Sequence, residues 1–211
     1  MSFTYDGTDK PPKHVTHVEI APSTTTIEKG AFWDCASLES VDFGTSITSI
    51  EPSAFQGCSS LTTLTIPSSV KRIGRSAFRW CTSLRSIHIS GSIKSIGDSA
   101  FQECTSLVSV QLPRSLVHIK DYAFKDCTSL TSITLPAKTK SIANGAFANC
   151  SSLTAVMIPS SIKSIGKNAF MQCSALTVIA LPSSIEEIEP KAFEGCARLE
   201  DIATRNGTEV V

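Results

Sequence analysis

Eight cysteines divide this 211-residue chain into equal steps. They stand 23 residues apart, at Cys35, Cys58, Cys81, Cys104, Cys127, Cys150, Cys173 and Cys196. The same step of 23 separates eight Ala-Phe pairs and eight leucines, beginning at Phe32 and Leu38. A period of roughly 20 to 50 residues is typical of proteins in which one structural unit stacks on the next. The repeat therefore indicates a stacked, elongated architecture before any local signal is considered.

One complete repeat, residues 104–126, predicts two extended segments. Its first apolar residues have the L-x-x-L-x-L spacing of leucine-rich repeats, which places a short strand there. Pro113 ends this strand, and two further aliphatic residues predict a second extended piece. The residues that define the two segments are Leu107, Val110, Leu112, Leu116 and Ile119.

The remainder of the repeat predicts a short helix. Ala123, Phe124, Cys127 and Leu130 follow one another at steps of three and four, as residues do on one stripe of a helix. In another repeat Pro52 lies just before the Ala-Phe pair, where a first-turn proline removes no helical hydrogen bond. We therefore expect strand, extended segment and helix to occupy three sides of each repeat.

A single repeat cannot be stable alone. Burying about seven apolar side chains at roughly 1.5 to 3 kcal/mol each does not offset an ordering cost of roughly 1.5 kcal/mol for each residue. Stability must come from contacts between repeats, with the strands in one parallel sheet about 4.8 Å apart. The expected fold is a right-handed leucine-rich repeat solenoid of the α/β type. Its parallel sheet would line the concave side, with short helices and a second short extended segment on the other sides.

The repeat also sets the expected domain boundaries. Residues 1–14 are polar, contain Pro11-Pro12 and do not match the repeat, so we expect a disordered N-terminal tail. Residues 15–203 form a single solenoid of about eight rungs of 23 residues. Residues 204–211 form a C-terminal tail, which leaves an open edge at the last rung.

Charge and composition exclude several functions. The 19 basic and 19 acidic residues cancel, which argues against a nucleic-acid partner, and 41% apolar residues exclude a disordered chain. No run reaches the roughly 18 apolar residues of a membrane span, and the N-terminus lacks the apolar core of a signal peptide. We therefore expect no membrane insertion and a cytoplasmic or otherwise intracellular location, with a surface location only if the sequence is a fragment.

No catalytic or metal-binding pattern is visible. Equal spacing places all eight thiols in one layer, where only adjacent rungs could be bridged, and a helix on that side would hold the cysteines too far apart. We expect buried, free thiols that act as small core residues. The sequence has no C-x-x-C pair for zinc and no G-x-S-x-G or H-E-x-x-H motif. We therefore expect no enzyme activity, no cofactor and no metal.

The outward side chains of the predicted sheet are the candidate binding residues, because solenoids commonly bind partners on this face. Small hydroxyl and amide side chains dominate its middle rungs, whereas its last rungs become apolar, which is a candidate surface for a partner or for self-association. The alternative is that C-terminal residues cover the apolar rungs, or that the side chains are too small to form a patch. The candidate residues are Thr65, His88, Gln111, Thr134, Ala155, Met157, Val178 and Ala180.

A second row lies beside the other extended segment. Lys71, Lys94, Lys140 and Lys163 occupy one position of the repeat, interrupted by Val117. Such a row could engage an anionic surface. The simpler interpretation is that it keeps a repetitive sheet edge soluble and unpaired.

Two segments carry a family resemblance. CSSLTTLTIPSSVKRIGRSAF (58–78) and CSSLTAVMIPSSIKSIGKNAF (150–170) resemble the BspA-type leucine-rich repeat family, and the match extends over roughly residues 18–202. The resemblance implies adhesion or protein binding rather than catalysis. The chain departs from the pattern at Ala137-Lys138-Thr139, where Pro-Ser-Ser-Ile is expected. We interpret it as a protein-binding or scaffold module that uses its concave face. The alternative is a cell-surface or secreted adhesin-like protein that binds host or matrix proteins.

Overall fold

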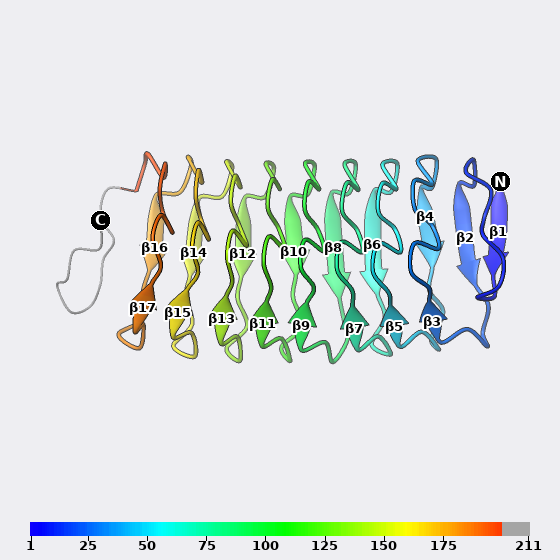
Figure 1. Ribbon diagram of the computed structural model, residues 1–211, viewed down its shortest axis with the longest axis horizontal. Coiled ribbons are helices and arrows are strands. Elements are labelled where there is room, and N and C mark those ends of the chain that lie inside the picture. The colour runs from blue at the N-terminus through cyan, green and yellow to red at the C-terminus, as the bar shows by residue number, and fades with distance from the viewer. Residues whose placement is uncertain (200–211) are drawn as a thin grey trace.

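The computed structural model describes residues 1–199, and these form a solenoid of parallel strands (Figure 1). Each rung contributes a strand of three or four residues to one side and a strand of two residues to another, and a series of turns closes the third side. We call these sides the long-strand face, the short-strand face and the turn side. The predicted leucine-rich repeat solenoid is confirmed, with its parallel strands.

The long strands form three sheets, in the orders β1-β2-β4, β6-β8-β10 and β12-β14-β16. From β2 onward, paired residues are one period apart, so that Thr65 pairs with His88 and His88 with Gln111. The bounds are β1 Ser2–Tyr5, β2 His17–Ile20, β4 Ser40–Asp42, β6 Thr63–Ile66, β8 Ser86–Ile89, β10 Ser109–Gln111, β12 Ser132–Thr134, β14 Ala155–Met157 and β16 Val178–Ala180.

The short strands form one sheet of eight, which runs through every rung. Each contributes an outward residue and an isoleucine, and the isoleucine of each rung lies beside that of the next. The bounds are β3 Thr26–Ile27, β5 Ser49–Ile50, β7 Arg72–Ile73, β9 Ser95–Ile96, β11 His118–Ile119, β13 Ser141–Ile142, β15 Ser164–Ile165 and β17 Glu187–Ile188.

The predicted helix was wrong: the turn side consists of consecutive turns with no helix among residues 1–199. In one rung, Tyr122 and Asp126 have φ angles of 58° and 62°, which a right-handed helix cannot contain. The amides of Tyr122, Phe124 and Asp126 donate to carbonyls of the next rung at 2.8 to 2.9 Å. The amides between them donate three residues back, as Lys125 does to Tyr122 at 3.1 Å. Alternate amides therefore join neighbouring rungs instead of closing a helix.

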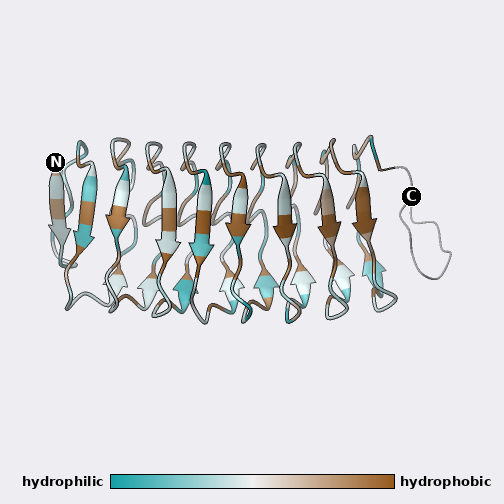
Figure 2. Ribbon diagram, turned by 180° about the vertical axis from the view of Figure 1, so that it is seen from behind, coloured by the Kyte–Doolittle hydropathy of each residue, from teal (hydrophilic) through white to brown (hydrophobic). Residues whose placement is uncertain are grey.

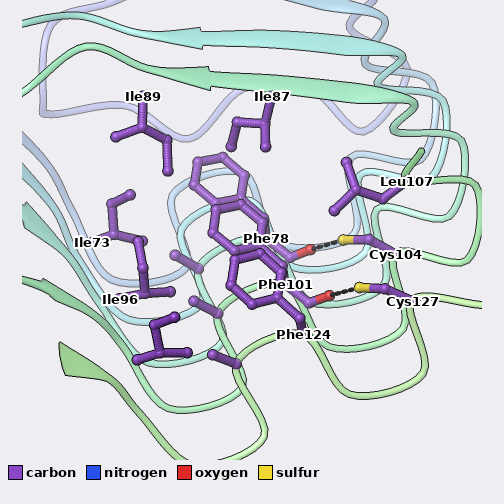
Figure 3. Close-up of a cluster of buried hydrophobic side chains, with 14 of the residues drawn as sticks. Ile73, Phe78, Ile87, Ile89, Ile96, Phe101, Cys104, Leu107, Phe124 and Cys127 are labelled. Carbon is purple, nitrogen blue, oxygen red and sulfur yellow. Dashed lines mark hydrogen bonds between the residues drawn. The ribbon is translucent and has the colours of Figure 1, made fainter. Parts of the chain in front are cut away.

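A column of phenylalanine rings forms the centre of the solenoid (Figure 3). Successive rings from Phe32 to Phe193 lie 4.8 to 5.6 Å apart between centroids and are parallel to within 10°. Separations of this size are favourable for offset-stacked aromatic pairs. At the N-terminal end the ring of Tyr5 contacts Phe32 edge-on at 5.0 Å. Because each ring from Phe32 to Phe170 is covered on both sides, its burial depends on the neighbouring rungs.

The cysteines add a second tie between rungs. All eight are buried and free, as predicted. The thiol of Cys104 donates to the carbonyl of Phe78 in the preceding rung at 3.2 Å, and that of Cys127 donates to Phe101 at the same distance (Figure 3). The same contact recurs from Cys58 to Cys196. Each thiol from Cys58 to Cys196 thus donates to a buried carbonyl of the rung before it.

Surface hydroxyls repeat the pattern outside the core. Thr154 donates its hydroxyl to the carbonyl of Thr131, one period earlier, and Thr177 donates to Thr154, both at 3.2 Å. Thr128 makes the same contact with Thr105 at 3.3 Å. The abundance of Ser and Thr therefore has a structural use, because a short hydroxyl can reach the equivalent carbonyl of the neighbouring rung.

The predicted disorder of residues 1–14 was wrong for the N-terminal strand. Residues Ser2–Tyr5 form β1, which pairs in parallel with β2, and the side chain of Tyr5 is buried. Strand β1 does not show the 23-residue sequence pattern because it precedes the repeats and only covers the first rung. At the other end Ile188 and Phe193 are half-buried. Residues 204–211, predicted to form a tail, lie outside the described part of the chain.

The phenylalanine column predicts that identical substitutions differ with position. Phe101→Ala removes a fully buried ring stacked on both sides and should cost about 4 kcal/mol of unfolding free energy. Phe193→Ala removes a half-buried ring with one stacked neighbour among residues 1–199, and should cost about half as much. Urea unfolding followed by circular dichroism measures both. Equal losses, or a larger loss at Phe193, would contradict stabilisation by two-sided stacking.

Candidate functional site

The long-strand face carries a hollow of about 530 Å³ over β6, β8 and β10. Strand alternation builds it, because the apolar residues of each strand point into the core and the polar ones outward. Thr65, His88, Gln111 and Thr134 are all among its lining residues. The structure therefore brings together the four polar residues that the sequence singled out on this face. The hollow extends across the boundary between the β10 and β12 sheets.

The chemistry of the hollow is polar and uncharged except at its rim. An imidazole nitrogen of His88 is hydrogen-bonded to the Gln111 side chain, which fixes both groups across neighbouring strands. Leu64 and Ile87 also line the hollow, but their side chains are buried in the core beneath it, and Arg114 brings a positive charge. No carboxylate lines it. The hollow can therefore offer hydrogen bonds to a partner.

The four apolar candidates lie beside the hollow and not in it. Ala155 pairs with Val178 and Met157 with Ala180 on β14 and β16, and all four side chains are exposed. Met157 is 77% exposed and Val178 57%, values that are high for side chains of this size. Figure 2 shows the brown colour of apolar residues along these two strands. Thr134 pairs with Met157, so the polar hollow continues directly into this apolar patch.

A second, smaller hollow was missed by the sequence analysis. It has a volume of about 320 Å³ and lies where the β4 and β6 sheets separate, lined among others by His17, Ser40 and Asp42. His17 is hydrogen-bonded to the Ser40 hydroxyl at 2.8 Å. Gly44 lines this hollow, stands where most repeats have proline and adopts a φ of 58°. Ser90 also replaces that proline, yet β8 pairs on both sides, so the substitution alone does not predict a break in the sheet.

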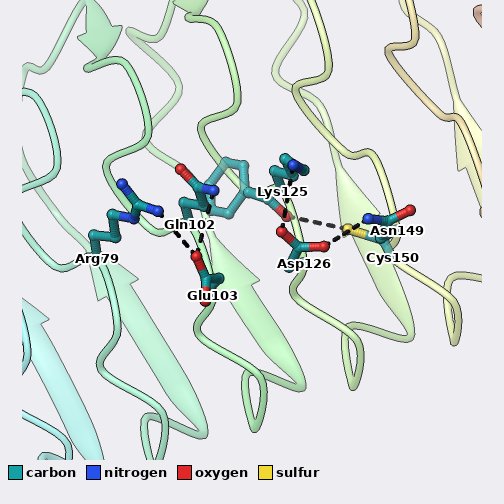
Figure 4. Close-up of polar contacts among 8 residues, drawn as sticks. Arg79, Gln102, Glu103, Lys125, Asp126, Asn149 and Cys150 are labelled. Carbon is teal, nitrogen blue, oxygen red and sulfur yellow. Dashed lines mark hydrogen bonds and ion pairs between the residues drawn. The ribbon is translucent and has the colours of Figure 1, made fainter.

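The turn side carries charged side chains that join rungs (Figure 4). A guanidinium nitrogen of Arg79 lies 3.0 Å from a carboxylate oxygen of Glu103 in the next rung. The guanidinium carbon of Arg79 lies over the Trp80 ring, 4.2 Å from its centroid. Asn149 donates to Asp126 of the preceding rung at 2.6 Å. These contacts account for the conspicuous polar residues of this side as ties between neighbouring turns.

The buried thiols have no ligand-binding geometry. Burial raises the pKa of Cys104 from 9.0 to about 12, and it also raises the pKa values of Cys58 and Cys81. A thiol must lose its proton to coordinate a metal, so a raised pKa opposes coordination at neutral pH. Within residues 1–199, no three His, Cys, Asp or Glu side chains come together as a metal site requires.

The repeat geometry and the comparisons with known proteins agree. The family model described as BspA type Leucine rich repeat region (6 copies) matches residues 12–128 and 94–211. The chain belongs to the BspA-type leucine-rich repeat family. The predicted resemblance is confirmed, and proteins of this solenoid type are in general interaction or scaffold modules. No curated protein matches the chain.

Solved structures of other leucine-rich repeat proteins share the fold. The T. pallidum leucine-rich repeat protein TpLRR is 31% identical with a TM-score of 0.72, over 78% of this chain and 79% of that one. A leucine-rich repeat protein from Eubacterium ventriosum ATCC 27560 is 24% identical with a TM-score of 0.64. That match covers 92% of this chain but 47% of the other, so this BspA-type chain spans about half of that protein.

One structural finding concerns membranes. None of residues 1–199 belongs to a helix of the length and apolarity needed to cross a bilayer.

The raised thiol pKa values predict a dependence of stability on pH. Unfolded thiols lose their protons near pH 9, whereas the folded protein keeps them, to about pH 12 at Cys104. The unfolded state then binds fewer protons, so the unfolding free energy should fall as pH rises from about 9 to about 11. Urea unfolding at several pH values, under reducing conditions, measures this.

The matched variant for this test is Cys104→Ala combined with Cys127→Ala. It removes two of the eight thiols, so the unfolding free energy should fall less steeply with rising pH than in the wild type. An identical fall in both proteins would show that the thiols titrate alike in the folded and unfolded states.

Proposed function

We propose that this BspA-type protein is a non-catalytic binding module that holds a protein partner on its long-strand face. The observation that supports this most strongly is the polar hollow that continues into an exposed apolar patch. Protein interfaces combine these features, with an apolar centre and a polar rim. Thr65, His88, Gln111 and Thr134 would supply the hydrogen bonds, while Met157 would be the largest apolar contact.

The backbone supports this role by holding the face rigid. The side chains lie on strands that are paired in parallel within each of two sheets, β6-β8-β10 and β12-β14-β16, and Gln111 and His88 already constrain each other. A surface ordered before binding loses little conformational entropy when a partner arrives. From Thr65 to Ala180 the face spans five rung spacings, about 24 Å. That length suits an interface of standard size, about 800 Å² on each partner.

The proposed setting follows from the thiols. Eight buried free cysteines, each donating to a carbonyl or lying in the same column, need to stay reduced to keep these contacts. Such a protein suits a compartment that maintains thiols in the reduced state. The apolar patch on β14 and β16 is the surface at which a second copy could compete with another protein partner.

The test compares two equal substitutions on different sides. Thr134→Arg places a large cation beside the hollow, whereas Thr105→Arg makes the same change at an exposed position after Cys104 on the turn side. A partner captured from the source cells by the wild type should be lost with Thr134→Arg and kept with Thr105→Arg. His88→Ala and Met157→Glu should weaken the measured affinity of the purified pair by about tenfold or more.

Two outcomes contradict the proposal. The first is that Thr134→Arg, His88→Ala and Met157→Glu all leave affinity unchanged. The second is that the wild-type protein forms a dimer in sedimentation experiments that Met157→Glu abolishes, while no other protein competes for this face. The second result would assign the patch to self-association.

A further inference from the structure

The short-strand face carries a column of lysines along the axis of the solenoid. Lys71, Lys94, Lys140 and Lys163 each occupy the position before a short strand, at β7, β9, β13 and β15. All four side chains are exposed. With rungs about 4.8 Å apart, the column extends about 19 Å from Lys71 to Lys163. The repeat therefore arranges these charges in a line along the axis, which suits an extended ligand better than a compact one.

Other basic residues widen this column into what we call the basic strip. It comprises the residues from one position before to two positions after each short strand from β7 to β15. Arg72, Arg75, Lys120 and Lys167 belong to it, and each is exposed. The strip thus has eight basic residues against two acidic ones, a net charge of +6 in a chain whose total is zero. Its charge is concentrated along the short-strand face and the beginning of the turn side, and it is not balanced locally.

Within residues 1–199, few acidic side chains pair with the basic residues of the strip. The two acids inside it, Asp98 and Asp121, are half-buried, and Asp121 accepts a hydrogen bond from the amide of Asn144. Of the four salt bridges found within residues 1–199, one reaches the strip, from Lys163 to Glu186 at 3.0 Å. Glu186 stands in the lysine position of the next rung, where the strip ends. The acidic last rung therefore sets a boundary to the strip.

We propose that the basic strip binds an extended acidic segment of another polypeptide, laid along the solenoid axis. Charge complementarity identifies the partner, because a run of Glu or Asp side chains would meet cations in every rung from β7 to β15. Six of the eight basic residues are lysines, whose single charges on flexible stems suit carboxylates at varied spacing. This surface is separate from the long-strand face, so the inference stands independently of the proposed function.

Two other anionic partners fit the strip less well. Single-stranded nucleic acid is held largely by aromatic side chains that stack on bases, and the strip contains no Phe, Tyr or Trp. A membrane surface is usually engaged with apolar side chains beside the cations, and the exposed large apolar residues of the described chain all lie outside the strip. Carboxylates require neither feature.

The experiment measures binding of a fluorescent glutamate decapeptide by anisotropy at low salt. The wild type should bind, and the affinity should fall steeply as salt is added, because exposed charges are screened. Lys94→Glu combined with Lys140→Glu should weaken binding by about tenfold or more. Glu186→Lys should strengthen it, because it extends the column by one rung and releases Lys163.

The matched control carries the same change of charge elsewhere. Lys10→Glu combined with Arg85→Glu alters two exposed basic residues outside the strip and should change affinity less than about twofold. Thermal unfolding of each variant shows that all remain folded. Equal losses in the two double variants, no binding by the wild type at low salt, or tighter binding of a uridine decanucleotide or of phosphatidylserine vesicles would each overturn the proposal.

Discussion

Contacts between each rung and the next, repeated at a period of 23 residues, hold this protein together. Three kinds of contact share this register: the hydrogen bonds of the strands and turns, the parallel rings of the phenylalanine column, and the thiols that donate to carbonyls one rung back. Since each contact needs the same offset, none can form in a rung without a correctly placed neighbour. The faces that we propose as binding surfaces have the same regularity, with side chains about 4.8 Å apart along the axis.

The sequence predicted the strands and the core because both depend on apolar spacing, which the repeat shows eight times. It did not predict the turn side, because steps of three and four fit a helix and a series of alternating turns equally well. The deciding feature is a positive φ before each Ala-Phe pair and before each cysteine. Glycine occupies four of those positions, at Gly30, Gly57, Gly145 and Gly195, all with positive φ. Other residues, such as Tyr122 and Asp126, occupy the rest and do not by themselves indicate a positive φ. A comparison across rungs could have revealed it.

The candidate site, too, was predicted only in part from the sequence. Alternation along each strand was enough to predict which residues of the long-strand face point outward, including His88 and Met157. The two hollows could not be predicted, because they depend on where neighbouring sheets separate, at β4 and β6 and beyond β10. Strand β1 was missed for a related reason, since a covering strand makes its contacts once and leaves no repeated pattern.

The most direct test of this account is to excise one period. Removal of residues 104–126 joins Glu103 to Cys127 and keeps every column in register, so the shortened protein should fold and unfold cooperatively with a moderately lower free energy of unfolding. Removal of residues 104–120 deletes fewer residues but breaks the register, and that protein should not fold. Urea unfolding of both would decide. A 104–120 deletion as stable as the 104–126 deletion, or an unfolded 104–126 deletion, would contradict the claim that contacts between equivalent positions of successive rungs stabilise the protein.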